Sequence, residues 1–140
     1  MVEIREFHGM PDAAMAVRVP VFVEEQGFVD EFDDTDRTAV HFVAFDGETP
    51  IGTCRIFTED GGRSYLLGRL CVLKAYRGQA IGTALVAAAE QGVRDRGGES
   101  LALHSQYHAK DFYQKLGYAP YGEVEDEQGC PHIWMKKVFG

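Results

Sequence analysis

The chain has 140 residues, of which 45% are apolar and 26% are charged, and 22 acidic against 14 basic side chains give a formal net charge of −8. This length is typical of one domain, spanning residues 1–140, which can bury ~70% of the surface exposed by the unfolded chain. The acidic excess argues against general affinity for nucleic acid or anionic membrane. No apolar run approaches the ~20 residues that cross a bilayer, and the first ten residues lack a signal-peptide core.

The three cysteines, Cys54, Cys71 and Cys130, are odd in number and far apart, with no Cys-x-x-Cys pair. This pattern is more typical of reduced thiols in a cytoplasmic protein than of a disulfide framework or a zinc site. We therefore expect a cytoplasmic protein without a metal centre.

The hydrophobic pattern predicts an α/β domain, with helices flanking a mixed sheet of six or seven strands. Strands are expected at residues 2–7, 41–45, 51–58, 64–73, 101–105, 118–123 and 132–138, and helices at residues 12–26, 80–96 and 109–116. Pro20 is expected to break or kink the first helix. The acidic segment 27–36 is predicted to be a loop, and Asp46-Gly47 predicts a hairpin turn.

The stretch VLKAYRGQAIGTAL, residues 72–85, passes from the end of a predicted strand into the start of a predicted helix. Such a junction leaves several backbone N–H groups without partners, and the helix dipole adds positive charge at the same place. Small residues would let a phosphate approach, and Arg77 could reach a second oxygen, so the turn can hold a pyrophosphate. The alternative is a tight turn with glycine for conformation and arginine for solubility.

Two better-known phosphate motifs are absent from this stretch. No Gly-Lys-Ser/Thr ending follows, which excludes a P-loop, and only Gly78 and Gly82 could match the dinucleotide pattern GxGxxG.

The segment Arg77-Gly78-Gln79-Ala80-Ile81-Gly82 matches the pattern Arg/Gln-x-x-Gly/Ala-x-Gly/Ala, and a second block, DFYQKLGY, follows at residues 111–118. With these two blocks the chain resembles the GCN5-related N-acetyltransferase (GNAT) family over most of its length. Ala80 stands where the family usually has glycine. The resemblance implies a GNAT-like fold whose central strands splay apart to bind acyl-CoA.

The resemblance also implies a set of donor-binding residues. The splayed strand would pair with the pantetheine arm of acetyl-CoA, the co-substrate, and the N–H of Val72 would polarise the thioester carbonyl. Backbone groups from Gln79 to Thr83 would hold the pyrophosphate. The implied set is Leu70, Cys71, Val72, Arg77, Gly78, Gln79, Ala80, Gly82, Thr83 and Tyr113.

Tyr113 is the candidate general acid. In the resembled family the tyrosine at this position lies near the CoA sulfur, where a neutral phenol can protonate the leaving thiolate. Phe112 and Leu116 are expected to pack in the core. Tyr113 is expected to face elsewhere, about 100° around the helix.

A general base is also required, because the attacking amine must be neutral. The candidates are Glu24, Glu25, Asp33, Asp34, Asp36, His104, His108 and His132. For each of them, a solvated charge or a hydrogen-bonded structural histidine is the alternative. The segments from Arg18 to Gln26 and from Gly129 to Met135 resemble a small bacterial group of uncharacterised GNAT proteins, and this makes His132 a base or acceptor-binding candidate.

These features favour direct transfer of acetyl from acetyl-CoA to a primary amine, on a small molecule or a lysine. They are compatible with a homodimer. One alternative is a non-catalytic acyl-CoA-binding sensor that lacks a base. A second is an acyl-homoserine-lactone synthase, suggested by Arg18, Phe22 and the acidic segment. Those synthases are substantially longer, and the only tryptophan here, Trp134, falls near the C-terminus.

Overall fold

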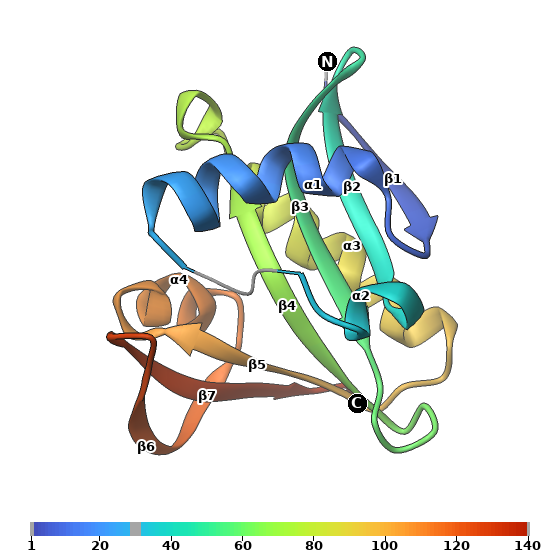
Figure 1. Cartoon of the computed structure of the whole chain (residues 1–140). Helices are drawn as coiled ribbons and strands as arrows, with labels where there is room; N and C mark the ends of the chain where they lie inside the picture. Colours follow the sequence, from blue (N-terminus) through green and yellow to red (C-terminus); the bar gives the residue numbers. More distant parts are fainter. Residues whose placement is uncertain (1, 29–31, 140) are drawn as a thin grey trace.

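The computed structural model describes residues 2–28 and 32–139. Within these residues, seven strands form one mixed sheet in the order β1-β2-β3-β4-β5-β7-β6 (Figure 1). The strands are β1 (Val2–His8), β2 (Val40–Asp46), β3 (Thr49–Phe57), β4 (Ser64–Val72), β5 (Ser100–Gln106), β6 (Ala119–Glu127) and β7 (Cys130–Val138). The predicted α/β class with a mixed sheet is confirmed.

Helices cover both faces of the sheet. They are α1 (Asp12–Arg18), η1 (Val19–Glu25), α2 (Thr35–Thr38), η2 (Lys74–Tyr76), α3 (Ile81–Asp95), η3 (Tyr107–Ala109) and α4 (Lys110–Lys115). The helix formed by α1 and η1 crosses one face and α3 lies behind the sheet on the other (Figure 1). The apolar stripe of α3, which includes Leu85, Ala89 and Val93, is fully buried and builds the main core against β2, β3 and β4. In the described residues no helix has the length and apolar character that crossing a membrane requires.

The first helix continues past Pro20, where the sequence predicted a break or a kink. It changes at Val19 from α to π winding, and the amide of Gln26 donates to the carbonyl of Val21, five residues earlier, at 3.0 Å. A proline lacks the N–H of a regular helix interior, and a wider turn accommodates its ring. The continuous helix brings Phe22 and Gln26 over the middle of the sheet.

Two loop predictions need correction. Residues 35–38 of the acidic segment and its flank form the short helix α2 rather than loop, while residues 29–31 lie outside the described residues. The last hairpin is longer than predicted: β6 continues to Glu127 and turns at Gln128-Gly129, where both residues have positive φ. The acidic residues Glu125, Asp126 and Glu127 therefore belong to a strand.

Strands β4 and β5 separate partway along their length. They pair in parallel only over Ser64–Leu67 and Ser100–Leu103, and beyond this point they diverge (Figure 1). Directly after the last pair, β4 carries a bulge. Arg69 has a φ of +54°, and two residues of β4 stand opposite the single residue Cys54 of β3. A bulge bends a strand and increases its twist, which turns the end of β4 away from β5.

Candidate active site

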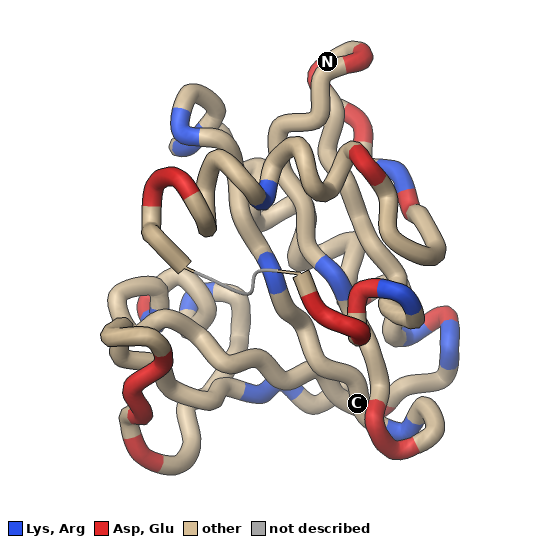
Figure 2. Tube along the Cα trace, in the orientation of Figure 1, with Lys and Arg blue, Asp and Glu red and all other residues tan. Residues whose placement is uncertain are grey.

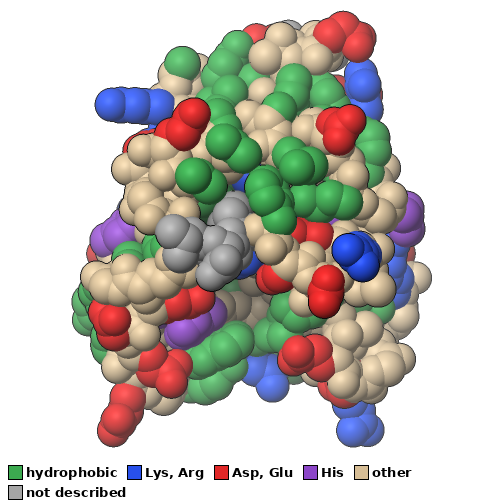
Figure 3. Space-filling model, viewed as in Figure 1, with side chains coloured by type: hydrophobic (Ala, Val, Ile, Leu, Met, Phe, Trp, Pro, Cys, Tyr) green, Lys and Arg blue, Asp and Glu red, His purple; other side chains and the backbone are tan. Residues whose placement is uncertain are grey.

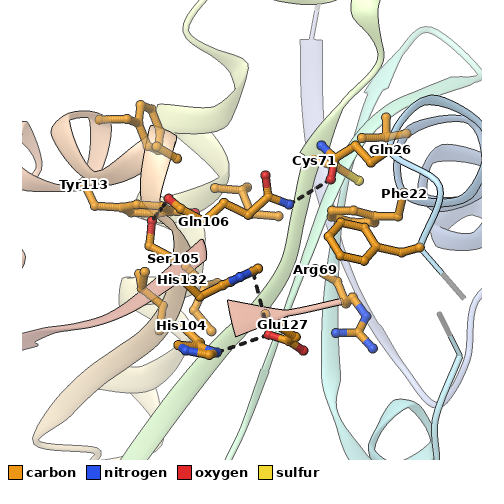
Figure 4. A pocket seen from close by; sticks show the side chains of 18 of the residues that line it. Phe22, Gln26, Arg69, Cys71, His104, Ser105, Gln106, Tyr113, Glu127 and His132 are labelled. Atoms are coloured by element: carbon orange, nitrogen blue, oxygen red, sulfur yellow. Dashed lines mark hydrogen bonds and ion pairs between the residues drawn. The ribbon is translucent and has the colours of Figure 1, made fainter. Parts of the chain in front are cut away.

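The divergence of β4 and β5 opens a cavity of about 640 Å³. Its walls come from η1, β3, β4, β5, η3, α4 and the β6–β7 hairpin. The close view shows Phe22, Gln26 and Cys71 on one side of this wedge, facing Gln106, Ser105 and Tyr113 on the other (Figure 4). A hydrogen bond of 2.7 Å from Gln106 Nε2 to Gln26 Oε1 crosses between the two sides.

The open edge of β4 offers backbone groups to the cavity. The N–H of Leu73 donates to the carbonyl of Ile51 on β3 at 2.8 Å. Because successive residues of a strand direct their backbone groups to opposite edges, the N–H and C=O of Val72 face the wedge. The carbonyl of Val72 there accepts a hydrogen bond of 3.0 Å from Arg77 Nε.

The turn after β4 ends at the N-terminus of α3. Ala80, the residue before the helix, is left-handed with a φ of +62°, no side chain caps the helix, and its first turn holds no acidic residue. A Cβ added to Gly78 would meet no atom within 4 Å. The exposed amides and the helix dipole together suit an anion such as a pyrophosphate.

Gly82 lies beside α4, a contact that the sequence did not indicate. A Cβ on Gly82 would lie 3.4 Å from Cζ of Phe112, which is an ordinary van der Waals distance. An alanine would therefore fit at this position, and a larger side chain would have to pass the Phe112 ring.

Arg77, which the sequence suggested as a ligand of a phosphate oxygen, is paired with Glu25. Its two terminal nitrogens bind both carboxylate oxygens of Glu25 at 2.8 and 2.7 Å. The hydrogen bond from Arg77 lowers the pKa of Glu25 below its ordinary value. This pair joins the end of η1 to the turn before α3, and it makes Glu25 a weaker base.

Tyr113 is buried, with 8% of its surface exposed, and belongs to the main core, whereas Phe112 and Leu116 only pack against that core. The expectation that Tyr113 faces away from the core is therefore wrong. Its ring makes edge contacts with Phe112 and Tyr118, and it also lines the cavity. Burial raises its pKa above the ordinary value, so the phenol keeps its proton at neutral pH.

Strand register places two histidines and a tryptophan together at the other end of the cavity. His104 on β5 stands opposite Trp134 on β7, and His132 lies two residues before Trp134, on the same face. The ring centroids of His104 are 4.9 Å from His132 and 4.7 Å from Trp134, the latter pair nearly parallel. All three residues line the cavity.

The end of β6 adds two carboxylates to these rings. Glu127 Oε2 lies 3.2 Å from His104 Nδ1 and 3.7 Å from His132 Nε2, while Glu125 Oε1 lies 3.3 Å from His104 Nε2. Acidic and histidine side chains gather over this hairpin in the space-filling view (Figure 3), and acidic positions mark its end in the tube (Figure 2).

The remaining base candidates have other environments. Asp33 and Asp36 bind the guanidinium groups of Arg55 and Arg18 at 2.7 to 3.1 Å, outside the cavity lining. His108 lines the cavity and contacts Gln106. Glu24 and Asp34 are exposed and lie outside the cavity lining.

Sequence reasoning did not identify Glu127, Trp134 or the Gln26–Gln106 bridge as part of this site. The sequence feature that could have identified Glu127 and Trp134 is the turn Gln128-Gly129. This turn fixes the pairing of β6 with β7 and places Glu125 opposite His132. Placing a turn there extends both strands and brings the acidic residues beside the histidines.

The chain matches a family model described as an acetyltransferase (GNAT) domain over residues 11–139. The uncharacterized N-acetyltransferase YjcF of Bacillus subtilis is 37% identical over 127 residues, covering 89% of each chain. The crystal structure of Escherichia coli ElaA superposes with a TM-score of 0.87 at 28% identity, covering 98% of this chain and 99% of that one.

An aminoglycoside 6′-N-acetyltransferase complexed with coenzyme A shares the fold. Its TM-score is 0.79 at 22% identity, covering 97% of this chain and 96% of that one. The GNAT family model covers the splayed strands, the turn before α3 and the α4 block that build the cavity. The chain belongs to the GNAT family and is an acyl-CoA-dependent acyltransferase.

Proposed function

We propose that this acyltransferase moves an acetyl group from acetyl-CoA directly to a primary amine, on a small molecule or a lysine. One observation carries the proposal. A single cavity has the backbone edge of β4 and Tyr113 in its walls, and His132 lies in the same walls. A donor thioester and an acceptor amine could meet between them.

The donor would be held mainly by backbone groups. The amides from Gln79 to Thr83 would bind the pyrophosphate, since the start of α3 has no cap and no acid in its first turn. The open edge of Leu70, Cys71 and Val72 would pair with the pantetheine arm. The N–H of Val72, which faces the wedge, would hydrogen-bond to the thioester carbonyl.

Two side chains would move the protons. The acceptor enters as an ammonium, and Nε2 of His132 would take one proton and leave a neutral amine. After attack, the phenol of Tyr113 would give its proton to the departing CoA sulfur, and the proton lost by the new amide would restore the phenol. A tyrosine phenol is protonated at neutral pH and burial raises the pKa of Tyr113 further, so the proton is present when the thiolate departs.

The test is thiol release from acetyl-CoA in the presence of a panel of primary amines, including diamines, aminoglycosides and lysine peptides. We expect release that depends on the acceptor. His132→Ala should slow turnover by about 10²–10⁴-fold, the usual contribution of a positioned base. The affinity for acetyl-CoA, measured by calorimetry, should stay unchanged.

His8→Ala is the matched control, because the His8 side chain is exposed on β1, lies outside the cavity lining and is paired with Glu6. This variant should turn over normally. Binding of acetyl-CoA without release for any amine would contradict the proposal and favour a non-catalytic acyl-CoA sensor. Full turnover in His132→Ala would remove His132 from the mechanism.

A further inference from the structure

Glu127 is shared by two imidazoles at the end of the cavity. Its Oε2 lies 3.2 Å from Nδ1 of His104 and 3.7 Å from Nε2 of His132 (Figure 4). The two rings come from different strands, β5 and β7, and the carboxylate comes from a third, β6. The sheet register therefore assembles a group that no local sequence motif contains.

His104 lies between two carboxylates. Glu127 is 3.2 Å from Nδ1 and Glu125 is 3.3 Å from Nε2. Nε2 is buried and makes no hydrogen bond among the described residues, so the contact with Glu127 at Nδ1 is the one that can orient the ring. The indole of Trp134 stacks on the ring at 4.7 Å and 20° and holds it in this plane.

His132 has the surroundings of a base. Its Nδ1 is 2.8 Å from the carbonyl of Cys130. Because a carbonyl only accepts hydrogen bonds, Nδ1 must donate, and in the neutral ring the lone pair is left on Nε2. This nitrogen is the one that lies near Glu127. A proton arriving at Nε2 would create a positive charge beside the carboxylate.

We propose that Glu127 is a positioning residue that couples the two histidines. It orients His104 through Nδ1, and it stabilises His132 when Nε2 has taken the proton of the acceptor ammonium. The role of His132 rests on the proposed function. The proton moves from the acceptor nitrogen to Nε2 of His132, the acceptor becomes a neutral amine, and Glu127 keeps its charge throughout.

Other charged groups also line this cavity. They are Arg55 on β3, Arg69 on β4, and Glu25 with Arg77, which are paired with each other. Arg55 and Arg69 are both bound to Asp33. Because these groups are unchanged in the variants below, a difference between variants reports the removed carboxylate.

The coupling can be measured by nitrogen-15 NMR of the imidazoles in the full chain at one fixed pH, because the chemical shift of each ring nitrogen reports its hydrogen bonding. Glu127→Gln should change the shifts of Nδ1 of His104 and Nε2 of His132, since it replaces the carboxylate near both nitrogens by an amide. Glu125→Gln should change chiefly the shift of Nε2 of His104. Glu123→Gln removes the same charge from β6 at a residue with no contact to either ring among the described residues, and it should move neither.

A Glu127→Gln spectrum in which only one imidazole moves would overturn the proposal. So would a Glu123→Gln variant that moves both rings as far as Glu127→Gln does. Glutamine keeps the size of glutamate at an exposed position, so these variants should fold, and their melting temperatures check this.

Kinetics separates this proposal from the function on which it rests. Glu127→Gln should lower kcat about tenfold or more, with an unchanged KM for acetyl-CoA, because only the proton-transfer step is affected. If His132→Ala turns over normally while Glu127→Gln still moves the signals of both imidazoles, His132 is not the base, but the coupling through Glu127 stands. A normal kcat in Glu127→Gln, with His132→Ala inactive, would overturn the positioning role.

Discussion

Ala80 adopts a left-handed backbone conformation directly before α3, with a φ of +62°. In this conformation the Cβ of an L-residue crowds the following carbonyl, at a cost of roughly 1–2 kcal/mol. The resembled family usually has glycine here, and glycine adopts this conformation without the crowding. The strain lies at the amides that we propose as the pyrophosphate site.

Ala80→Gly should therefore stabilise the protein by about 1 kcal/mol, less than the full strain because glycine is also freer in the unfolded chain. This corresponds to a rise in Tm of roughly 3–5 °C, measured by differential scanning calorimetry. The control is Ala87→Gly, at an exposed position within α3, which should lose about 1 kcal/mol. Destabilisation by Ala80→Gly would show that the methyl group of Ala80 makes a stabilising contact that outweighs the strain.

A buried network of ion pairs connects α1 and α2 to the sheet. Asp36, with 2% of its side chain exposed, binds Arg18 of α1 and Arg55 of β3, while Asp33 binds Arg55 and Arg69. Arg69 is the bulge residue of β4. The network therefore connects the segment before α2 with the point where β4 leaves β5.

Asp36→Asn should destabilise the protein by about 3–5 kcal/mol, because it leaves two buried arginines without their shared carboxylate. Asp34→Asn is the control, since Asp34 is exposed beside the network, and it should change stability little. Equal stability of the two variants, measured by urea unfolding, would show that the buried network contributes nothing to stability.

The network also predicts how stability depends on pH. Burial by itself would raise the pKa of Asp36, but the hydrogen bonds from Arg18, from the Asp33 amide and from Arg55 outweigh it and lower this pKa below the usual range. A carboxyl with a lowered native pKa stabilises the fold above its unfolded pKa of about 3.9 and loses that contribution as pH falls towards the native value. Asp36→Asn should therefore flatten the loss of stability below about pH 4.

Across the whole fold, short sequence patterns predicted the structural features that depend on neighbouring residues. Apolar periodicity predicted α3, Asp46-Gly47 predicted the β2–β3 turn, and the segment from Arg77 to Gly82 predicted the strand-to-helix junction with its family. Each of these features depends on residues that are close in the sequence.

Features set by distant contacts were not predictable in the same way. Tyr113 is buried because α4 packs on the sheet and on α3, and Arg77 meets Glu25 because η1 continues past Pro20. The histidine and glutamate cluster depends on the register of three strands. A shift by one residue would have directed its side chains to the opposite face.

Direct transfer with Tyr113 as the acid can be tested by the single-turnover rate of Tyr113→Phe with acetyl-CoA and an accepted amine. We expect this rate to fall by about 10²–10⁴-fold, with acetyl-CoA affinity and Tm nearly unchanged. Tyr118→Phe is the control, because its hydroxyl binds Glu90 and it does not line the cavity, so it should keep its rate. An undiminished rate in Tyr113→Phe, with chemistry limiting, would show that Tyr113 is not the general acid.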